Sequence, residues 1–273
     1  MVMIKMKKKD ISMHYRNMVG IYPSTSALHV HDGEELLLVL TGVSRIVTEK
    51  RVERCSGSFI IFYPMGVPHT QFSDADKPYE RYCMQYKPDA IANLLPPGLL
   101  PRTFFVLPLT HDETEQLLTY VRPLKDACEA EDSPTIIRRR KLLLALVLNE
   151  LAPLVQERLP EAELTSENSS LIADICMYIS EHFAEPLTLD ALARQFFISR
   201  SKLVRSFRSA LDTTVLDYIT AVRVSHSKEM LHEGMSVQET AHRCGFADVG
   251  YYIKIFRKAT GTTPAKFRKT AEI

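Results

Sequence analysis

The hydrophobic and polar positions divide the chain into an N-terminal part with strand-like patterns and a C-terminal part with helical patterns. Between residues 27 and 88, short apolar and β-branched runs are separated by turn residues such as Gly42 and Pro64. Short strands at such regular spacing predict a small barrel or sandwich. The expected strands are Glu35–Leu40, Val43–Thr48, Ser58–Phe62 and Glu80–Tyr86, followed by Thr103–Leu107.

Two amphipathic helices are expected over residues 111–158. Thr110 and Glu113 have the spacing of a capping box, and Ser133 followed by Pro134 marks a second helix start. The second helix is apolar on more than one face, through Ile136, Ile137, Leu143, Leu144, Val147, Leu148, Leu151 and Val155. Such a helix must be covered on both sides, either by its own domain or by a second copy of the chain. We favour a dimer interface.

The polar stretch from Pro160 to Ser170 lacks periodicity and predicts a linker, which we place at residues 161–169. Helical periodicity dominates after it, and Gly234 is placed to end the longest helix. The expected helix starts are Ser170, Thr188, Ser199, Thr214, Ser236 and Asp248.

The C-terminal region contains an internal repeat. Leu189 and Ala193 correspond to Val237 and Ala241 at an offset of 48. At an offset of 49, Leu203, Arg205, Phe207, Arg208, Thr213 and Tyr218 correspond to Tyr252, Lys254, Phe256, Arg257, Thr262 and Phe267. Each copy is a short helix, a turn and a longer helix, expected at 189–195 and 200–211, then 237–244 and 249–260. This pattern is typical of the helix-turn-helix, whose second helix enters the DNA major groove.

The charge distribution supports nucleic-acid binding only when the chain is divided. The net charge of the whole chain is +1, whereas residues 169–273 contain 14 Lys or Arg against 11 Asp or Glu. Basic residues gather on the first longer repeat helix, at Arg200, Lys202, Arg205 and Arg208, and on or just after the second, at Lys254, Arg257, Lys258, Lys266, Arg268 and Lys269. Basic side chains on one helix face can neutralise DNA phosphates.

The composition excludes several classes of protein. With 45% hydrophobic and 25% charged residues, the chain is neither disordered nor of low complexity. No apolar run approaches the length of a membrane-spanning helix, and the N-terminus lacks the pattern of a secretory signal. Five scattered cysteines without a paired motif favour reduced thiols and a cytoplasmic protein.

Residues 170–269 resemble the DNA-binding domain of the AraC family of bacterial transcription regulators. The residues that carry the resemblance are Leu189, Ala193, Ser199, Leu203, Phe207, Arg223, Ala241, Gly245, Phe246, Asp248, Tyr251, Tyr252, Phe256, Arg257, Lys258, Gly261, Thr263, Pro264, Phe267 and Arg268. The resemblance implies seven helices, with two helix-turn-helix units joined by a long helix at 214–233. It also implies that one chain reads two successive major grooves of double-stranded DNA.

The resemblance assigns DNA contacts by helix position. The expected DNA-binding residues are Arg200, Ser201, Lys202, Val204, Arg205 and Arg208 in the first unit, and Val249, Gly250, Tyr251, Lys254 and Arg257 in the second. Arg205 is the best candidate for base recognition, because a guanidinium can bond a guanine edge in two places. Val249 and Gly250 offer no side-chain hydrogen bonds, so the second helix is expected mainly to hold phosphates. Phe207, Tyr252 and Phe256 are expected in the core.

His29, His31, Glu35 and His69 resemble the ligand positions of the cupin barrel, where three imidazoles and a carboxylate bind a divalent metal. The match is partial, because Pro23 and Ser73 replace residues usual in the cupin motifs. These four residues are therefore the expected effector-binding residues, and a divalent metal is the candidate cofactor. The alternative is that they hydrogen-bond within the barrel or contact an effector without a metal.

Together these observations predict an α+β protein of two domains. Residues 1–160 form a cupin-like domain that senses a small-molecule effector and dimerises, the dimerisation being expected of the helices at about 111–158. Residues 170–273 form an all-α domain with two helix-turn-helix units. The expected function is transcription regulation by a homodimer, with RNA polymerase as a further partner if the protein is an activator, and no membrane. Two alternatives are a metal-dependent cupin enzyme, an oxygenase or isomerase with a DNA-binding tail, and an N-terminal domain that only dimerises. The chain shows no set of nucleophile, base and oxyanion donor, which argues against the enzyme.

Overall fold

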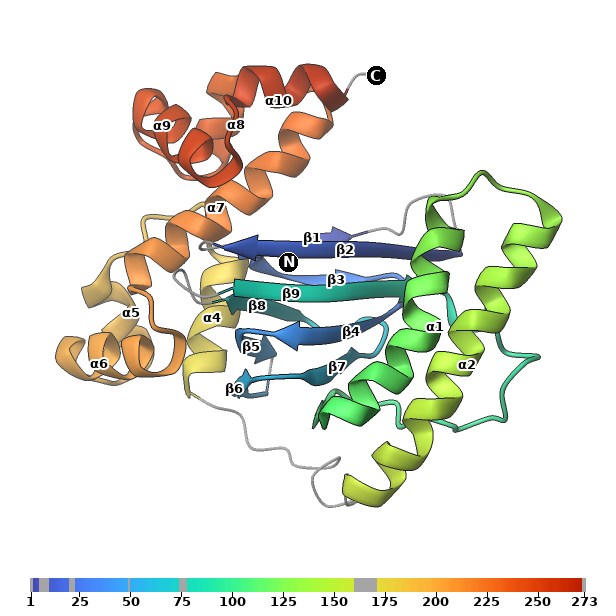
Figure 1. Ribbon diagram of the computed structural model, residues 1–273. Helices are drawn as coiled ribbons and strands as arrows, with labels where there is room; N and C mark the ends of the chain where they lie inside the picture. The colour runs from blue at the N-terminus through green and yellow to red at the C-terminus, as the bar shows by residue number, and fades with distance from the viewer. Residues whose placement is uncertain are drawn as a thin grey trace.

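Two five-stranded sheets form the N-terminal part of the molecule (Figure 1). The computed structural model describes residues 2–4, 10–19, 23–48, 50–73, 78–159 and 171–271. Its strands are β1 (Val2–Ile4), β2 (Ile11–Val19), β3 (Pro23–His31), β4 (Glu34–Thr41), β5 (Val43–Thr48), β6 (Val52–Ser56), β7 (Phe59–Tyr63), β8 (His69–Ser73), β9 (Pro78–Tyr86) and β10 (Phe105–Pro108). The strand orders are β1-β3-β8-β5-β6 and β10-β7-β4-β9-β2. Among the described strands, only the β1–β3 pair is parallel.

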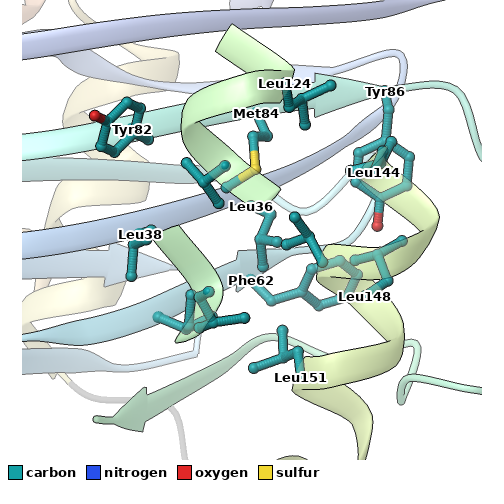
Figure 2. Close-up of a cluster of buried hydrophobic side chains, with 14 of the residues drawn as sticks. Leu36, Leu38, Phe62, Tyr82, Met84, Tyr86, Leu124, Leu144, Leu148 and Leu151 are labelled. Atoms are coloured by element: carbon teal, nitrogen blue, oxygen red, sulfur yellow. The ribbon is translucent and has the colours of Figure 1, made fainter. Parts of the chain in front are cut away.

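Two helices, α1 (His111–Glu129) and α2 (Pro134–Arg158), cover the outer face of the second sheet (Figure 1). Strand β4 is apolar at consecutive positions because both of its faces are buried. Leu36 and Leu38 pack toward the helices, whereas Leu37 and Val39 belong to the cluster inside the barrel. Figure 2 shows the helical contacts of this sheet, made by Leu124, Leu144, Leu148 and Leu151.

Specific polar contacts define the helical hairpin. The Thr110 hydroxyl accepts from the Glu113 backbone N–H, and the Glu113 carboxylate accepts from the Thr110 N–H, so the expected capping box is confirmed. At the other end of α1, the buried Arg140 donates from Nε to the Ala127 carbonyl (2.7 Å) and from Nη2 to the Ala130 carbonyl (3.0 Å). Arg140 therefore satisfies carbonyl groups that the last turn of a helix leaves without partners.

The C-terminal part is helical over its described residues. Its seven helices are α4 (Leu171–Glu181), α5 (Leu189–Gln195), α6 (Arg200–Leu211), α7 (Val215–His232), α8 (Val237–Arg243), α9 (Val249–Thr260) and α10 (Pro264–Ala271). Side-chain caps occur at the expected residues Thr188, Ser199, Thr214, Ser236 and Asp248, and Ser133 caps α2 in the same way. Gly234, with φ +87°, follows the end of α7 as expected.

The helical part packs against the outer face of the first sheet. Leu28 of β3 and Val47 of β5 are fully buried in one apolar cluster with residues of α4, α6 and α7. Beside this cluster, Arg45 Nη2 lies 2.9 Å from Asp212 Oδ2. Asp212 caps the C-terminus of α6 in the left-handed conformation, with φ +51°. The end of the first long repeat helix is thus tied to the barrel.

The expected elements are observed with ends that differ by one or two residues in most cases, and Val43–Thr48 is reproduced without a difference. Strands β1, β2, β3, β6 and β8 had no expected counterpart. β8 (HTQFS) carries His69 and Gln71 on its inner face, so it shows no apolar alternation. β2, an edge strand, does alternate at Ile11, Met13 and Tyr15, and this signal was missed. The expected linker at 161–169 lies outside the described residues. None of the described helices has the length and apolar character required to cross a membrane.

Candidate functional site

The two helix-turn-helix units have the same local geometry. The Ile198 N–H donates to the Ala193 carbonyl, and the equivalent Phe246 N–H donates to the Ala241 carbonyl, both at 3.0 Å. These bonds join the residue after the turn to the short helix, and they fix the direction in which the longer helix begins. The internal repeat of the sequence is therefore also a structural repeat.

Helix α6 presents a basic face to solvent. Its apolar residues Leu203, Phe207 and Leu211 are buried. The expected DNA-binding residues of this unit are all exposed: Arg200, Ser201, Lys202, Val204, Arg205 and Arg208. The Ser199 hydroxyl accepts from the Lys202 backbone N–H (3.1 Å), which sets the N-terminal turn on which the first three of these side chains lie.

Helix α9 presents a similar face with less hydrogen-bonding capacity. Gly250, Tyr251, Lys254 and Arg257 are exposed, whereas Val249 is half-buried and packs against the apolar core of the second unit. A surface depression beside these residues is lined by Gly250, Ile253, Lys254, Arg257, Lys258 and Thr263. The expected core positions of Phe207, Tyr252 and Phe256 are confirmed, because all three are fully buried.

A second constellation lies inside the barrel. His29 and His31 come from β3, Glu35 from β4 and His69 from β8, and all four side chains are buried. One potential ligand atom from each lies within 4.8 Å of the others. Glu35 Oε2 is 2.9 Å from His69 Nε2 and 3.3 Å from His31 Nε2. Burial alone would raise the pKa of Glu35, but hydrogen bonds and charges from both imidazoles hold this pKa well below its usual range.

The orientation of His69 is fixed from both sides. Its Nδ1 lies 2.9 Å from the Val67 carbonyl, which only accepts hydrogen bonds, so Nδ1 carries a proton. The ring stacks on Tyr63 with centroids 3.7 Å apart. In a neutral His69, the Nε2 lone pair would therefore face the Glu35 carboxylate. A cation bound between Nε2 and the carboxylate would make this arrangement favourable.

These residues fit a divalent transition metal. Imidazole and carboxylate donors suit such ions, and bonds of about 2.1 Å place ligand atoms within about 4.2 Å of one another, so small side-chain rotations suffice. A bond from the other ring nitrogen to a backbone carbonyl, as His69 makes, is the usual outer contact of a metal-binding histidine. His29, His31, Glu35 and His69 would hold the ion, which would supply open coordination positions for a small molecule.

Sequence inspection missed two groups at this site. Cys83 Sγ lies 2.9 Å from Glu35 Oε1, and Gln85 Nε2 donates to the same oxygen at 3.2 Å. Both occupy alternate positions of β9, whose other face packs on α1 and α2. The alternation within Pro78–Tyr86 is the signal that could have identified them.

Two family models match the chain. The AraC-like ligand binding domain matches residues 21–147, and a helix-turn-helix domain matches residues 192–270. This chain belongs to the AraC family of transcription regulators. The matched models describe a ligand-binding domain and a helix-turn-helix domain, and the matched relatives are regulators, so the comparisons do not support the enzyme alternative.

Relatives of this AraC-family chain include regulators with and without an assigned role. It is 30% identical over 142 residues to the uncharacterized regulator YijO of Escherichia coli K12, covering 52% of this chain and 49% of YijO. The transcriptional activator RhaS of Salmonella schwarzengrund is 25% identical over 251 residues, covering 88% of this chain and 87% of RhaS. A regulator from Pseudoalteromonas carrageenovora is 32% identical over 40% of this chain and 66% of the relative. The chain thus spans about half of YijO and just under two thirds of the Pseudoalteromonas regulator.

Two kinds of solved structure are similar. The DNA-binding domain of AdpA, solved in complex with a target DNA, is 30% identical over 37% of this chain and 93% of its own, with a TM-score of 0.36. ToxT of Vibrio cholerae O395 is 12% identical over 97% of this chain and 99% of its own, with a TM-score of 0.42.

Proposed function

We propose that this AraC-family regulator binds specific double-stranded DNA through α6 and α9 and is controlled by a small molecule bound inside its barrel. One observation carries the proposal: two structurally equivalent helices each bury their apolar face and expose a basic one. Exposed basic residues at equivalent places in a duplicated helix-turn-helix are suited to two successive major grooves. A single basic helix face would be weaker support, because solvated basic surfaces are common.

The first unit is proposed to recognise bases. Ser201, Lys202, Val204 and Arg205 would face base edges, with Arg200 and Arg208 nearer the phosphates. Arg205 has no hydrogen bond or ion pair with another described residue and can bond a guanine edge in two places. Arg200, by contrast, lies 3.6 Å from Asp190 of α5.

The second unit is proposed mainly to hold the DNA backbone. Gly250 has no side chain and Val249 is half-buried, which leaves Tyr251 and Lys254 as the polar groups nearest the bases. Lys254 and Arg257 border the basic surface depression, where phosphate oxygens would be favoured.

Selection of binding sites from a random duplex library tests the DNA-binding proposal. We expect enriched duplexes with two conserved blocks whose centres lie about 10–10.5 bp apart, the block under α9 being the less conserved. Affinity for the enriched duplex should fall steeply with salt concentration, because phosphate contacts release counterions. Recovery of duplexes without any common sequence would contradict specific recognition.

The barrel is proposed to pass the state of its interior to the DNA-binding domain through two shared strands. β3 directs His29 and His31 inward, while Leu28 packs on the helical domain and its N–H donates to Ser180 Oγ of α4 at 3.1 Å. β8 carries His69 inside, while Phe72 contacts the Tyr218 ring of α7, with centroids 5.7 Å apart. A ligand that moves either strand would therefore also change that strand's contacts with the DNA-binding domain. Allosteric control requires such a ligand to bind two arrangements of the domains with different affinity.

Helix α2 is proposed to form a homodimer interface. Its inner face packs on α1 and the sheet, but Ile137, Leu142 and Leu146 keep 41–44% of their surface exposed. Leu142 and Leu146 are one helical turn apart, so a second α2 could pack against them. Burial within one chain, the alternative suggested by the sequence, accounts for only one face of this helix.

The remaining partners follow from the proposed role. An activator of this family would contact RNA polymerase at its target promoters. A DNA-binding regulator of a bacterial chromosome acts in the cytoplasm, which agrees with the free cysteines among the described residues.

We propose further that the imidazole and carboxylate cluster binds a divalent metal. Titration of metal-free protein with Co²⁺ should give one equivalent of tightly bound metal, read by its visible absorption. The double variant His31→Ala/His69→Ala should lose this binding, because it removes two of four ligands. His111→Ala, which removes an exposed histidine at the start of α1, serves as the control. Equal binding by both variants, or none by the unmodified protein, would contradict the metal site.

A further inference from the structure

The inner face of β9 carries a buried arginine, Arg81, that is not part of the imidazole and carboxylate cluster. Along β9, Tyr82 and Met84 pack under α1 and α2 (Figure 2). Tyr79 and Cys83 of the same strand belong to the cluster inside the barrel. Arg81 alternates with the outward residues and is only 6% exposed. The guanidinium therefore lies in the barrel interior, on the inner side of the sheet that α1 and α2 cover.

Arg81 lacks the partners that a structural arginine has. Its Nε has no hydrogen-bond partner, and no described carboxylate forms an ion pair with it. Its guanidinium carbon lies 5.6 Å from the centre of the Tyr79 ring. Glu35 is not available, because its two oxygens are occupied by His69, His31, Cys83 and Gln85. A buried cation without a counter-charge costs folding free energy, so its retention calls for a ligand.

Two other buried arginines show the contrast. Arg140 bonds two backbone carbonyls and forms an ion pair with Asp132 at 2.6 Å. Arg45 forms an ion pair with Asp212 at 2.9 Å. Both have the counter-charge that a buried guanidinium requires, and only the arginine inside the barrel has none among the described residues.

The surroundings of Arg81 supply further hydrogen-bonding groups. Tyr79 Oη lies 2.9 Å from Ser44 Oγ. Ser73 is the cross-strand partner of Ser44, and its buried hydroxyl also has no hydrogen-bond partner in the structure. A cation and hydroxyl groups in an apolar wall are the usual composition of a site for an oxyanion.

We propose that Arg81 binds the anionic group of the effector, a carboxylate or a phosphate, inside the barrel. A guanidinium matches the planar fork of either oxyanion, and the hydroxyls of Tyr79 and Ser73 can donate to oxygens that it leaves free. On the inner face of β9, Cys83 lies between Arg81 and Gln85, and Gln85 bonds Glu35, so Arg81 and the imidazole cluster line the same inner wall. The anionic end would bind Arg81, and a donor at the other end would meet the imidazole cluster. Naming the molecule an effector rests on the proposed function, whereas the binding site does not.

Thermal unfolding of the full-length protein and of Arg81→Met tests this proposal, because methionine keeps the bulk of the side chain and removes the charge. The probes are sodium benzoate, sodium glucuronate and inorganic phosphate, each compared with sodium chloride at equal ionic strength. We expect at least one anion to raise the Tm of the unmodified protein by about 2–4 °C and to leave that of Arg81→Met unchanged. The anion that acts identifies the carboxylate or the phosphate class. Arg122→Met, which removes an exposed arginine of α1, should respond like the unmodified protein.

Without any anion, Arg81→Met should unfold at the same temperature as the unmodified protein or above it, since the variant no longer buries an uncompensated charge. A lower Tm would show that Arg81 is structural and would overturn the proposal. An equal rise in Tm for both proteins would also overturn it, because the anion would then bind the basic DNA-binding surface. The absence of any rise in Tm with all three anions would overturn it as well. The selection of DNA duplexes and the thermal unfolding with anions are independent experiments. A failure of the DNA-binding proposal can therefore be distinguished from a failure of the anion site.

Discussion

Replacing Gly245 by alanine is expected to destabilise the DNA-binding domain by about 3 kcal/mol. Gly245 lies in the turn of the second helix-turn-helix unit with φ +77°, where a residue with a Cβ costs about 1–2 kcal/mol. A Cβ there would also approach the carbonyl oxygen of Ala184 to 2.7 Å and its carbonyl carbon to 3.0 Å. Both are backbone atoms of the segment between α4 and α5, so relief requires the two units to move apart, and such overpacking costs about 1–3 kcal/mol more.

Denaturant unfolding of Gly245→Ala measures this loss, and Gly234→Ala is its matched control. Gly234 has φ +87° after α7, yet nothing lies within 4 Å of a Cβ built on it. The control should therefore lose only the conformational part, about 1–2 kcal/mol. Equal losses in the two variants would show that the Ala184 contact does not hold the units together.

Arg205→Ala is expected to weaken binding to the selected duplex by about 1–3 kcal/mol, close to a factor of 5 to 150, with relaxed preference at one or two base pairs. The side chain is exposed and has no hydrogen bond or ion pair with another described residue, so its removal should leave the fold intact. The loss should then appear in binding and leave the Tm unchanged.

Arg208→Ala provides the comparison on the same helix, one turn nearer its end. If Arg208 contacts phosphate, this variant should bind all sequences more weakly by a similar factor and lower the salt slope by about 1. Fluorescence anisotropy on the selected and a scrambled duplex, at several salt concentrations, separates the two behaviours. Equal losses on both duplexes for Arg205→Ala would remove this residue from base recognition.

The C-terminal domain was largely predictable because its signals are local. Caps such as Ser199 and Asp248 precede their helices by one residue, and the repeat brings two weak basic patterns into register. The buried cluster was partly predictable for the same reason. His29, His31 and Glu35 occur within seven residues, and only His69 had to be brought from a distant strand.

The remaining features depend on tertiary contacts. Strand β8 is polar because its inner face lines a polar interior, so its sequence does not alternate in the way that predicts a strand. Val249 was expected to face DNA, but packing against the apolar core of its own unit leaves it half-buried. The bond between Arg45 and Asp212 joins residues 167 positions apart, and no local pattern indicates it.

The sequence by itself therefore determined which segments are helices, where they begin, and that one DNA-binding unit occurs twice, because caps and periodicity act over a few residues. The tertiary structure decided which side chains face the barrel interior and which face the DNA-binding domain. It alone showed that Arg81 is a buried cation without a counter-charge among the described residues. Whether a charged side chain is buried, and whether it has a counter-charge, depends on strands that come together only in the folded protein. The number of charged residues along the chain therefore cannot reveal it.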